Sequence, residues 1–150
     1  MLRQVTTEDG VEIAYGDFGP RRGAAIVLCH GLCASGRQFQ WDADYFAGRG
    51  CRVLVPDLRA HGRSGAPEAL VPAAFTIARL ASDMLAMLDD ADVEAVDWVG
   101  NSLGGIVALE LLAQAGQRLR SLATFGTAYR LALPAFVPAI FKPRYGLFGR

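Results

Sequence analysis

Hydrophobic and polar positions alternate twice near the start of the chain, once over residues 3–7 and again over residues 11–15. A period of two is typical of strands that are buried on one face. The two segments are joined across Asp9-Gly10, a common sequence in tight hairpin turns. The pattern therefore predicts an antiparallel hairpin that starts a sheet.

Three later runs are short, largely apolar and rich in β-branched residues, which is typical of strands that are covered on both faces. They are residues 24–29, 51–55 and 96–99. Apolar residues at helical spacing separate or follow these runs in residues 38–47, 76–90 and 106–112. Thr76 is a candidate N-cap for the second of these helices. Helices that alternate with strands predict an α/β fold with a mostly parallel sheet and flanking helices.

The pattern changes near the end of the chain. Ala115-Gly116 suits the end of a helix, and residues 119–125 have the composition of a further strand. From Tyr129 to Arg150 the chain is apolar and aromatic, but three prolines interrupt it and it is too short to span a bilayer.

Composition narrows the classes of function. The chain has 150 residues, 52% of them hydrophobic, and its 15 basic side chains balance 15 acidic ones. That length suits one domain with a substantial core. The balanced charge argues against nucleic acid or a membrane surface as a partner. The first ten residues lack the apolar core of a signal peptide, so we expect a cytoplasmic protein.

Cysteine and histidine usage gives no indication of a metal. The three cysteines, Cys29, Cys33 and Cys51, are odd in number, and we interpret them as reduced thiols. The two histidines, His30 and His61, lie in separate predicted loops, without the spacing of metal ligands. We expect neither a metal nor a cofactor.

The most specific motif is a Gly-x-Ser-x-Gly turn formed by Gly100, Ser102 and Gly104. It lies between the apolar run 96–99 and the following helical pattern, which is the setting of a nucleophile elbow. A serine hydroxyl is a poor nucleophile, so it must stand clear of the backbone beside a base and amide donors. The motif predicts that Ser102 is a catalytic nucleophile. We interpret the neighbouring Asn101 as a residue that satisfies the turn.

Two more motifs follow predicted strands. His30-Gly31-Leu32 ends the first parallel strand, and the sequence Asp-Leu-Arg-Ala-His-Gly-Arg-Ser at residues 57–64 follows the second. Together with the elbow, and in this order, they resemble the α/β-hydrolase superfamily, in particular its cap-bearing branch with a serine nucleophile. The resemblance covers nearly the whole chain and corresponds to the first part of that fold.

The resemblance also implies roles for individual residues. The backbone N–H groups of Leu32 and Leu103 would form the oxyanion hole, where donors must face the developing negative charge. His30 would orient the oxyanion loop, while Asp57 and His61 would organise the loop that follows their strand. The resemblance further implies a partial hydrolase core at 1–128, truncated before the last strands, and the start of a cap or lid at 129–150.

The catalytic triad of this architecture is incomplete in the sequence. Its members occur in the order Ser, acid, His along the chain, yet the only carboxylate after Ser102 is Glu110 and no histidine follows. Glu110 lies about 12 Å further along the helix that Ser102 opens, too far to serve as the acid. We therefore expect a fragment whose remainder carries the acid and the histidine, and we expect the isolated chain to be inactive.

A serine at the elbow argues against the dehalogenase and epoxide hydrolase branches, which attack with a carboxylate. The predicted function is hydrolysis of an ester, thioester or lactone bond through an acyl-enzyme, with a small apolar acyl or lactone substrate. Hydrolytic C–C cleavage and acyl transfer use the same groups. Two other hypotheses remain open: a noncatalytic ligand-binding or interaction module, and a split enzyme that receives its acid and histidine from a partner chain.

Overall fold

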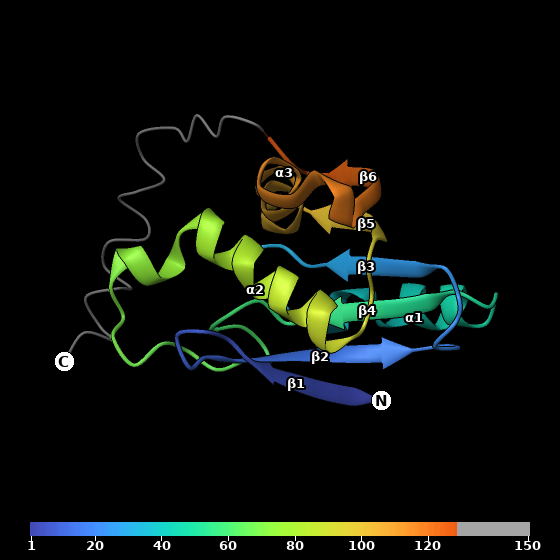
Figure 1. Ribbon diagram of the computed structural model, residues 1–150, viewed down its shortest axis with the longest axis horizontal. Coiled ribbons are helices and arrows are strands. Elements are labelled where there is room, and N and C mark those ends of the chain that lie inside the picture. The colour runs from blue at the N-terminus through green and yellow to red at the C-terminus, as the bar shows by residue number, and fades with distance from the viewer. Residues whose placement is uncertain (129–150) are drawn as a thin grey trace.

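One mixed sheet forms the centre of the molecule (Figure 1). The computed structural model describes residues 1–128, so the predicted cap at 129–150 lies outside the described residues. Within the described part, the strand order is β1-β2-β4-β3-β5-β6. The strands are β1 (Leu2–Thr6), β2 (Glu12–Phe18), β3 (Ala25–Cys29), β4 (Arg52–Pro56), β5 (Val96–Asn101) and β6 (Leu119–Phe125).

The pairing of the strands agrees with the sequence prediction. β1 and β2 form the expected antiparallel hairpin, and β2 also pairs antiparallel with β4. β4, β3, β5 and β6 are parallel to their neighbours. The prediction of an α/β fold with a mostly parallel sheet is therefore confirmed. Parallel pairing also places the carboxyl ends of four strands at the same edge of the sheet, where the three sequence motifs lie.

Helices cover both faces of this sheet. The α-helices are α1 (Gln40–Ala47), α2 (Ile77–Asp90) and α3 (Leu103–Ala115). α2 and α3 pack on one face and α1 lies on the other (Figure 1). Short 3₁₀ helices occur at Gly36–Phe39, Pro72–Phe75 and Gly116–Arg118. The helix predicted over 38–47 thus begins with a 3₁₀ turn, since its first residues connect the loop after β3 to α1.

The larger hydrophobic core lies between the sheet and α2 and α3. Trp98 on β5, Met84 and Leu88 on α2, and Leu111 on α3 are all nearly or completely buried in it. The predicted N-cap is confirmed, because the Thr76 hydroxyl accepts a hydrogen bond of 3.2 Å from the first turn of α2. None of the helices within residues 1–128 has the length and hydrophobicity needed to cross a membrane.

A buried ion pair holds the loop after β4 against this core. The Arg59 side chain is fully buried, and its Nε and Nη2 atoms each donate to Asp83 on α2 at 2.6 Å. Its Nη1 atom donates to Asp9 Oδ2 at 3.0 Å and to the carbonyl oxygen of Ala74 at 2.9 Å. The hydrogen bond from Arg59 holds the pKa of Asp9 well below its ordinary value. One guanidinium therefore ties four chain segments together.

Replacing one member of this ion pair is expected to be more harmful than replacing both. Arg59→Met leaves Asp83 buried without its partner, and such a loss typically costs about 3–5 kcal/mol. The double variant Arg59→Met/Asp83→Leu buries no unpaired charge and should recover part of that loss. Urea unfolding of the single and double variants measures the difference. A double variant less stable than Arg59→Met would contradict this account.

Candidate active site

The Gly-x-Ser-x-Gly motif forms a sharp turn between β5 and α3. Ser102 has φ 48° and ψ −110°, a combination that non-glycine residues rarely adopt. Such backbone strain persists only where the surrounding structure holds it, and it occurs preferentially at functional sites. The turn places Ser102 immediately before the first residue of α3, with the N-terminus of the helix behind it.

Close backbone contacts explain the two glycines of the motif. A Cβ atom on Gly100 would lie 2.6 Å from the amide nitrogen of Gly105, and one on Gly104 would lie 2.3 Å from the carbonyl oxygen of Cys29. Neither backbone atom could move aside without displacing β3 or α3. The buried indole of Trp98 adds a hydrogen bond of 3.1 Å from Nε1 to the carbonyl oxygen of Gly104. The start of α3 is therefore packed directly against the ends of β3 and β5.

The loop after β3 lies beside Ser102. In the parallel register, Cys29 on β3 is opposite Gly100 on β5, so the residues that follow them leave the sheet side by side. A Cβ atom on Gly31 would be only 3.3 Å from the Cβ atom of Ser102. The sequence motifs placed these two residues in one site, and the structure brings them together.

The two amides that the sequence analysis expected in the oxyanion hole come from different elements. Leu103 is the first residue of α3, and Leu32 follows Gly31 in the adjacent loop. Within residues 1–128, neither N–H group has a hydrogen-bond acceptor. The Leu32 side chain is 63% exposed.

His30 is occupied by structural hydrogen bonds. Its ring is completely buried; Nδ1 lies 2.7 Å from the carbonyl oxygen of Gly31, and Nε2 accepts from the amide of Leu58 at 3.0 Å. The neutral ring, protonated at Nδ1, satisfies both contacts. Burial lowers the pKa of His30 below its ordinary value, which favours this neutral form. His30 therefore links the loop after β3 to the loop after β4.

Asp57 and His61 also contact the backbone around them. Asp57 accepts from the amides of Gly36 at 2.6 Å and Arg63 at 2.9 Å. His61 Nδ1 lies 2.9 Å from the carbonyl oxygen of Arg59. These contacts fit the loop-organising roles that the sequence analysis gave to both residues. Within residues 1–128, no side chain forms a hydrogen bond with the Ser102 hydroxyl.

The structure adds contacts that sequence reasoning missed. The Ser102 amide donates to the carbonyl oxygen of Phe125 at the end of β6, at 2.9 Å, and the Thr127 hydroxyl donates to the carbonyl oxygen of Ser102 at 3.1 Å. The parallel pairing of β5 with β6 brings these residues to the elbow. The sequence could have indicated that the end of the strand at 119–125 lies at the elbow, if this strand had been expected to run parallel to the one before Ser102. It could not have indicated the hydrogen bond from Thr127.

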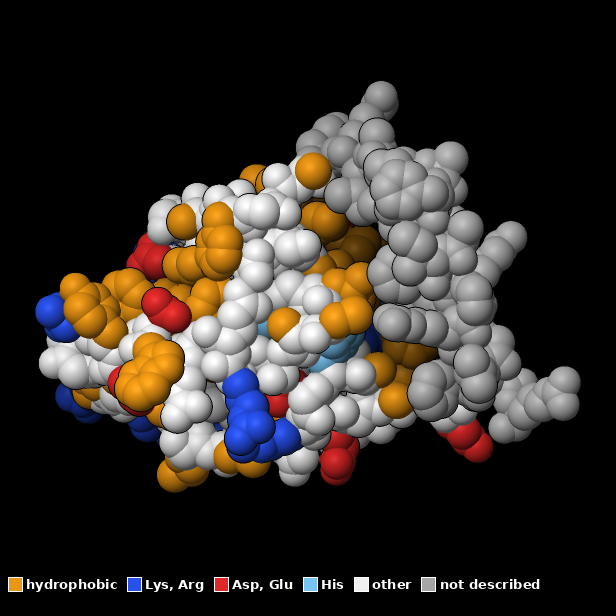
Figure 2. Space-filling model, turned by 180° about the vertical axis from the view of Figure 1, so that it is seen from behind, with side chains coloured by type: hydrophobic (Ala, Val, Ile, Leu, Met, Phe, Trp, Pro, Cys, Tyr) orange, Lys and Arg blue, Asp and Glu red, His pale blue; other side chains and the backbone are white. Residues whose placement is uncertain are grey.

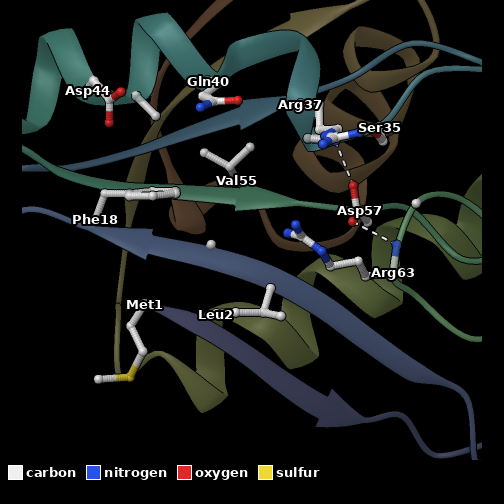
Figure 3. Close-up of a pocket in the computed structure, with 14 residues that line it drawn as sticks. Met1, Leu2, Phe18, Ser35, Arg37, Gln40, Asp44, Val55, Asp57 and Arg63 are labelled. Carbon is white, nitrogen blue, oxygen red and sulfur yellow. Dashed lines mark hydrogen bonds between the residues drawn. The ribbon is translucent and has the colours of Figure 1, made fainter.

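One cavity in the described part of the chain lies away from the elbow. It has a volume of about 770 Å³ and lies between the β1–β2 hairpin and α1, where Arg37, Asp44, Val55 and Arg63 are among its lining residues (Figure 3). Ser102 does not line it.

On the face opposite to that of Figure 1, hydrophobic side chains gather around a small patch of histidine surface (Figure 2). In the described part of the chain, no group of three or more His, Cys, Asp or Glu side chains could hold a metal ion.

Comparison with known proteins establishes the family. Residues 24–146 match the model of the alpha/beta hydrolase fold family, so the chain belongs to this family, as its motifs predicted. It is 37% identical over 115 residues to the non-heme chloroperoxidase of Burkholderia pyrrocinia, a match that covers 75% of this chain and 39% of the relative. It is 30% identical over 141 residues to epoxide hydrolase A of Mycobacterium tuberculosis, covering 92% of this chain and 42% of the relative.

Among solved structures, that of Est816, an N-acyl homoserine lactone degrading enzyme, has a similar fold. Its TM-score is 0.86 at 30% identity, and the match covers 95% of this chain and 53% of that chain. The chain therefore spans about two-fifths of the curated relatives described above and about half of this structural neighbour.

The neutral, buried state of His30 makes stability depend on pH. Because the pKa of His30 is lower in the folded protein than the ordinary value of 6.5, the unfolded chain binds a proton that the folded chain does not. Stability should therefore fall as the pH drops below about 6.5. Urea unfolding at about pH 7.5 and about pH 5 measures this loss, which should be smaller in His30→Gln. His61→Gln is the matched control, and an equal pH dependence in His30→Gln and the wild type would refute the assignment.

Proposed function

We propose that this chain is the amino-terminal part of a serine hydrolase that cleaves an ester, thioester or lactone bond through an acyl-enzyme. The observation that carries the proposal is the strained Ser102 turn, which lies at the end of β5 with Gly31 against it. In this proposal the Ser102 hydroxyl attacks the carbonyl carbon of the substrate, the leaving group departs, and water later releases the acyl group.

The two amides beside Ser102 suit the charge that this reaction develops. Attack on a carbonyl places negative charge on its oxygen, and donors fixed in advance stabilise that charge most effectively. The Leu103 amide lies at the N-terminus of α3, where the helix dipole also favours an anion. The Leu32 amide lies on the neighbouring loop. We propose these two N–H groups as the oxyanion hole, with His30 holding the loop that carries one of them.

The proton acceptor belongs to a part of the enzyme outside this chain. The sequence has no histidine after Ser102, and both ring nitrogens of His30 are already engaged. We propose that the remainder of the polypeptide supplies the acid and histidine of the triad, and that residues 1–150 alone do not turn over substrate. The match covers only 53% of the structural neighbour described above, which supports the proposal that further residues complete the enzyme.

The relatives support the substrate class. The structural neighbour described above is named as a lactone-degrading enzyme, and another similar structure is an esterase from Exiguobacterium antarcticum. Ser102 at the elbow favours these chemistries over epoxide opening by an attacking carboxylate. We therefore propose a small apolar acyl ester or lactone as the substrate.

Covalent labelling tests the nucleophile. In the full-length protein, a fluorophosphonate should label Ser102, because the probe needs a serine that is activated by a base and by oxyanion donors. Peptide mapping should find the label on the peptide that contains Ser102, and Ser102→Ala should abolish it. Ser121→Ala, a change at an exposed serine on β6, is the matched control. A noncatalytic module would remain unlabelled, and a label on another serine would rule out Ser102.

A second test removes one donor of the oxyanion hole. Leu32→Pro lacks the amide N–H and should lower kcat on the order of 10²-fold, as single-donor deletions do in other hydrolases. Leu32→Ala keeps the amide and should lose much less activity. Circular dichroism and urea unfolding check that both variants are folded. If folded Leu32→Pro and Leu32→Ala have the same kcat, the Leu32 amide is not part of the oxyanion hole.

A further inference from the structure

The end of β6 and the residues just after it contact both peptide groups of Ser102. The Phe125 carbonyl oxygen accepts from the Ser102 amide at 2.9 Å, and the Thr127 hydroxyl donates to the Ser102 carbonyl oxygen at 3.1 Å. The residue with the most unusual backbone in the elbow is therefore held on its N-terminal side by main chain and on its C-terminal side by a side chain.

The Ser102 carbonyl is also where α3 begins. It accepts from the amides of Gly105 at 3.1 Å and Ile106 at 3.2 Å. These two bonds orient the carbonyl toward the helix, and they would be satisfied by any ordinary helix start. Within the described residues, only the Thr127 hydroxyl connects this oxygen to the segment that follows β6. Together with the bond from the Ser102 amide to Phe125, it ties the turn to that end of the sheet.

Tight packing fixes the Thr127 side chain itself. A Cβ atom on Gly105 would lie 2.1 Å from Thr127 Oγ1 and 2.9 Å from its methyl carbon. The missing side chain at Gly105 thus makes room for this threonine against the first turn of α3. Thr127 Oγ1 also lies 3.4 Å from the Phe125 carbonyl oxygen, a longer contact than the one to Ser102. The shorter contact identifies Ser102 as the main acceptor of the single hydroxyl proton.

We infer that Thr127 is a positioning residue for the nucleophile. Its hydroxyl holds the strained Ser102 peptide in place, which keeps the serine hydroxyl in register with the amides of Leu32 and Leu103. The strain at φ 48° requires such external support, because relaxation of the turn would rotate the Ser102 side chain away from the neighbouring loop. The inference rests on the proposed serine hydrolase function and assigns a residue that the elbow motif does not contain.

Three substitutions separate this role from general packing. Thr127→Val keeps the shape but removes the hydroxyl, whereas Thr127→Ser keeps the hydroxyl and removes the methyl group. Thr124→Val is the matched control, since Thr124 is an exposed threonine on β6, three residues before Thr127. The measurements are the rate of Ser102 labelling by a fluorophosphonate and the kcat and KM for a short acyl ester, all in the full-length protein.

Loss of one neutral hydrogen bond that acts on the reactive geometry should slow labelling and kcat about three- to tenfold in Thr127→Val. KM should change little, because the substrate pocket is not altered. Thr127→Ser should restore most of the rate, and Thr124→Val should match the wild type. A merely structural threonine would instead lower the unfolding free energy without changing the rates of the folded enzyme.

The outcomes also separate this inference from the proposed function. Normal labelling and kcat in folded Thr127→Val overturn the role of Thr127 and leave the serine hydrolase proposal standing. If Thr127→Val does not fold, Thr127→Ala is compared with Thr127→Ser, and equal rates overturn the inference. Failure of the wild type to label at Ser102 overturns both proposals.

Discussion

The geometry of the candidate site depends on the alignment of three parallel strand ends. β3, β5 and β6 are neighbours in the sheet, and each ends at the edge where Ser102 lies. Helix α3 can begin there only because Gly104 lets its backbone approach the carbonyl oxygen of Cys29. The strained turn is therefore a consequence of close packing between the start of a helix and the ends of two strands. The motif has glycine at positions 100 and 104 because this packing leaves no room for a side chain there.

Several polar residues of the motifs form hydrogen bonds that maintain the loops around this edge. His30 bridges two loops through both ring nitrogens, and Asp57 accepts two backbone amides. A Cβ atom on Gly62 would lie 2.4 Å from the Asp57 carboxylate, so this loop also closes tightly on its own acceptor. Buried polar groups must be satisfied, and here the partners are almost entirely main chain. A histidine and an aspartate that resemble catalytic residues in sequence thus have structural explanations.

Local patterns in the sequence predict the elements and much of the site. Apolar runs at 24–29 and 51–55 differ by only a residue or so from β3 and β4, and the strand at 119–125 has the observed bounds. The elbow is also predictable, because its glycines are required by contacts within a few residues or with an adjacent strand. The helix predicted at 38–47 is less accurate, since its first turn is 3₁₀ and depends on the loop that precedes it.

Contacts between distant segments are the part that the sequence does not reveal. Arg59 meets Asp83 and Asp9 from 24 and 50 positions away, and Thr127 reaches Ser102 across 25 positions. An arginine in a polar loop has no periodicity that marks it as buried, and a threonine after a strand resembles an ordinary turn residue. Their roles follow from strand order and register, which fix the neighbours of each loop only once the whole sheet is assembled.

The proposed serine hydrolase reaction needs two kinds of group at its site. Backbone amides would stabilise the oxyanion, whereas proton transfer requires a titratable side chain within reach of the Ser102 hydroxyl. The two requirements differ physically: amide donors must be held rigidly, here at a helix start and in a loop, whereas a base needs only to reach the serine hydroxyl from any other element. In the proposed enzyme, the strained turn, the amides of Leu32 and Leu103 and the Thr127 contact therefore supply the electrostatic part of the site.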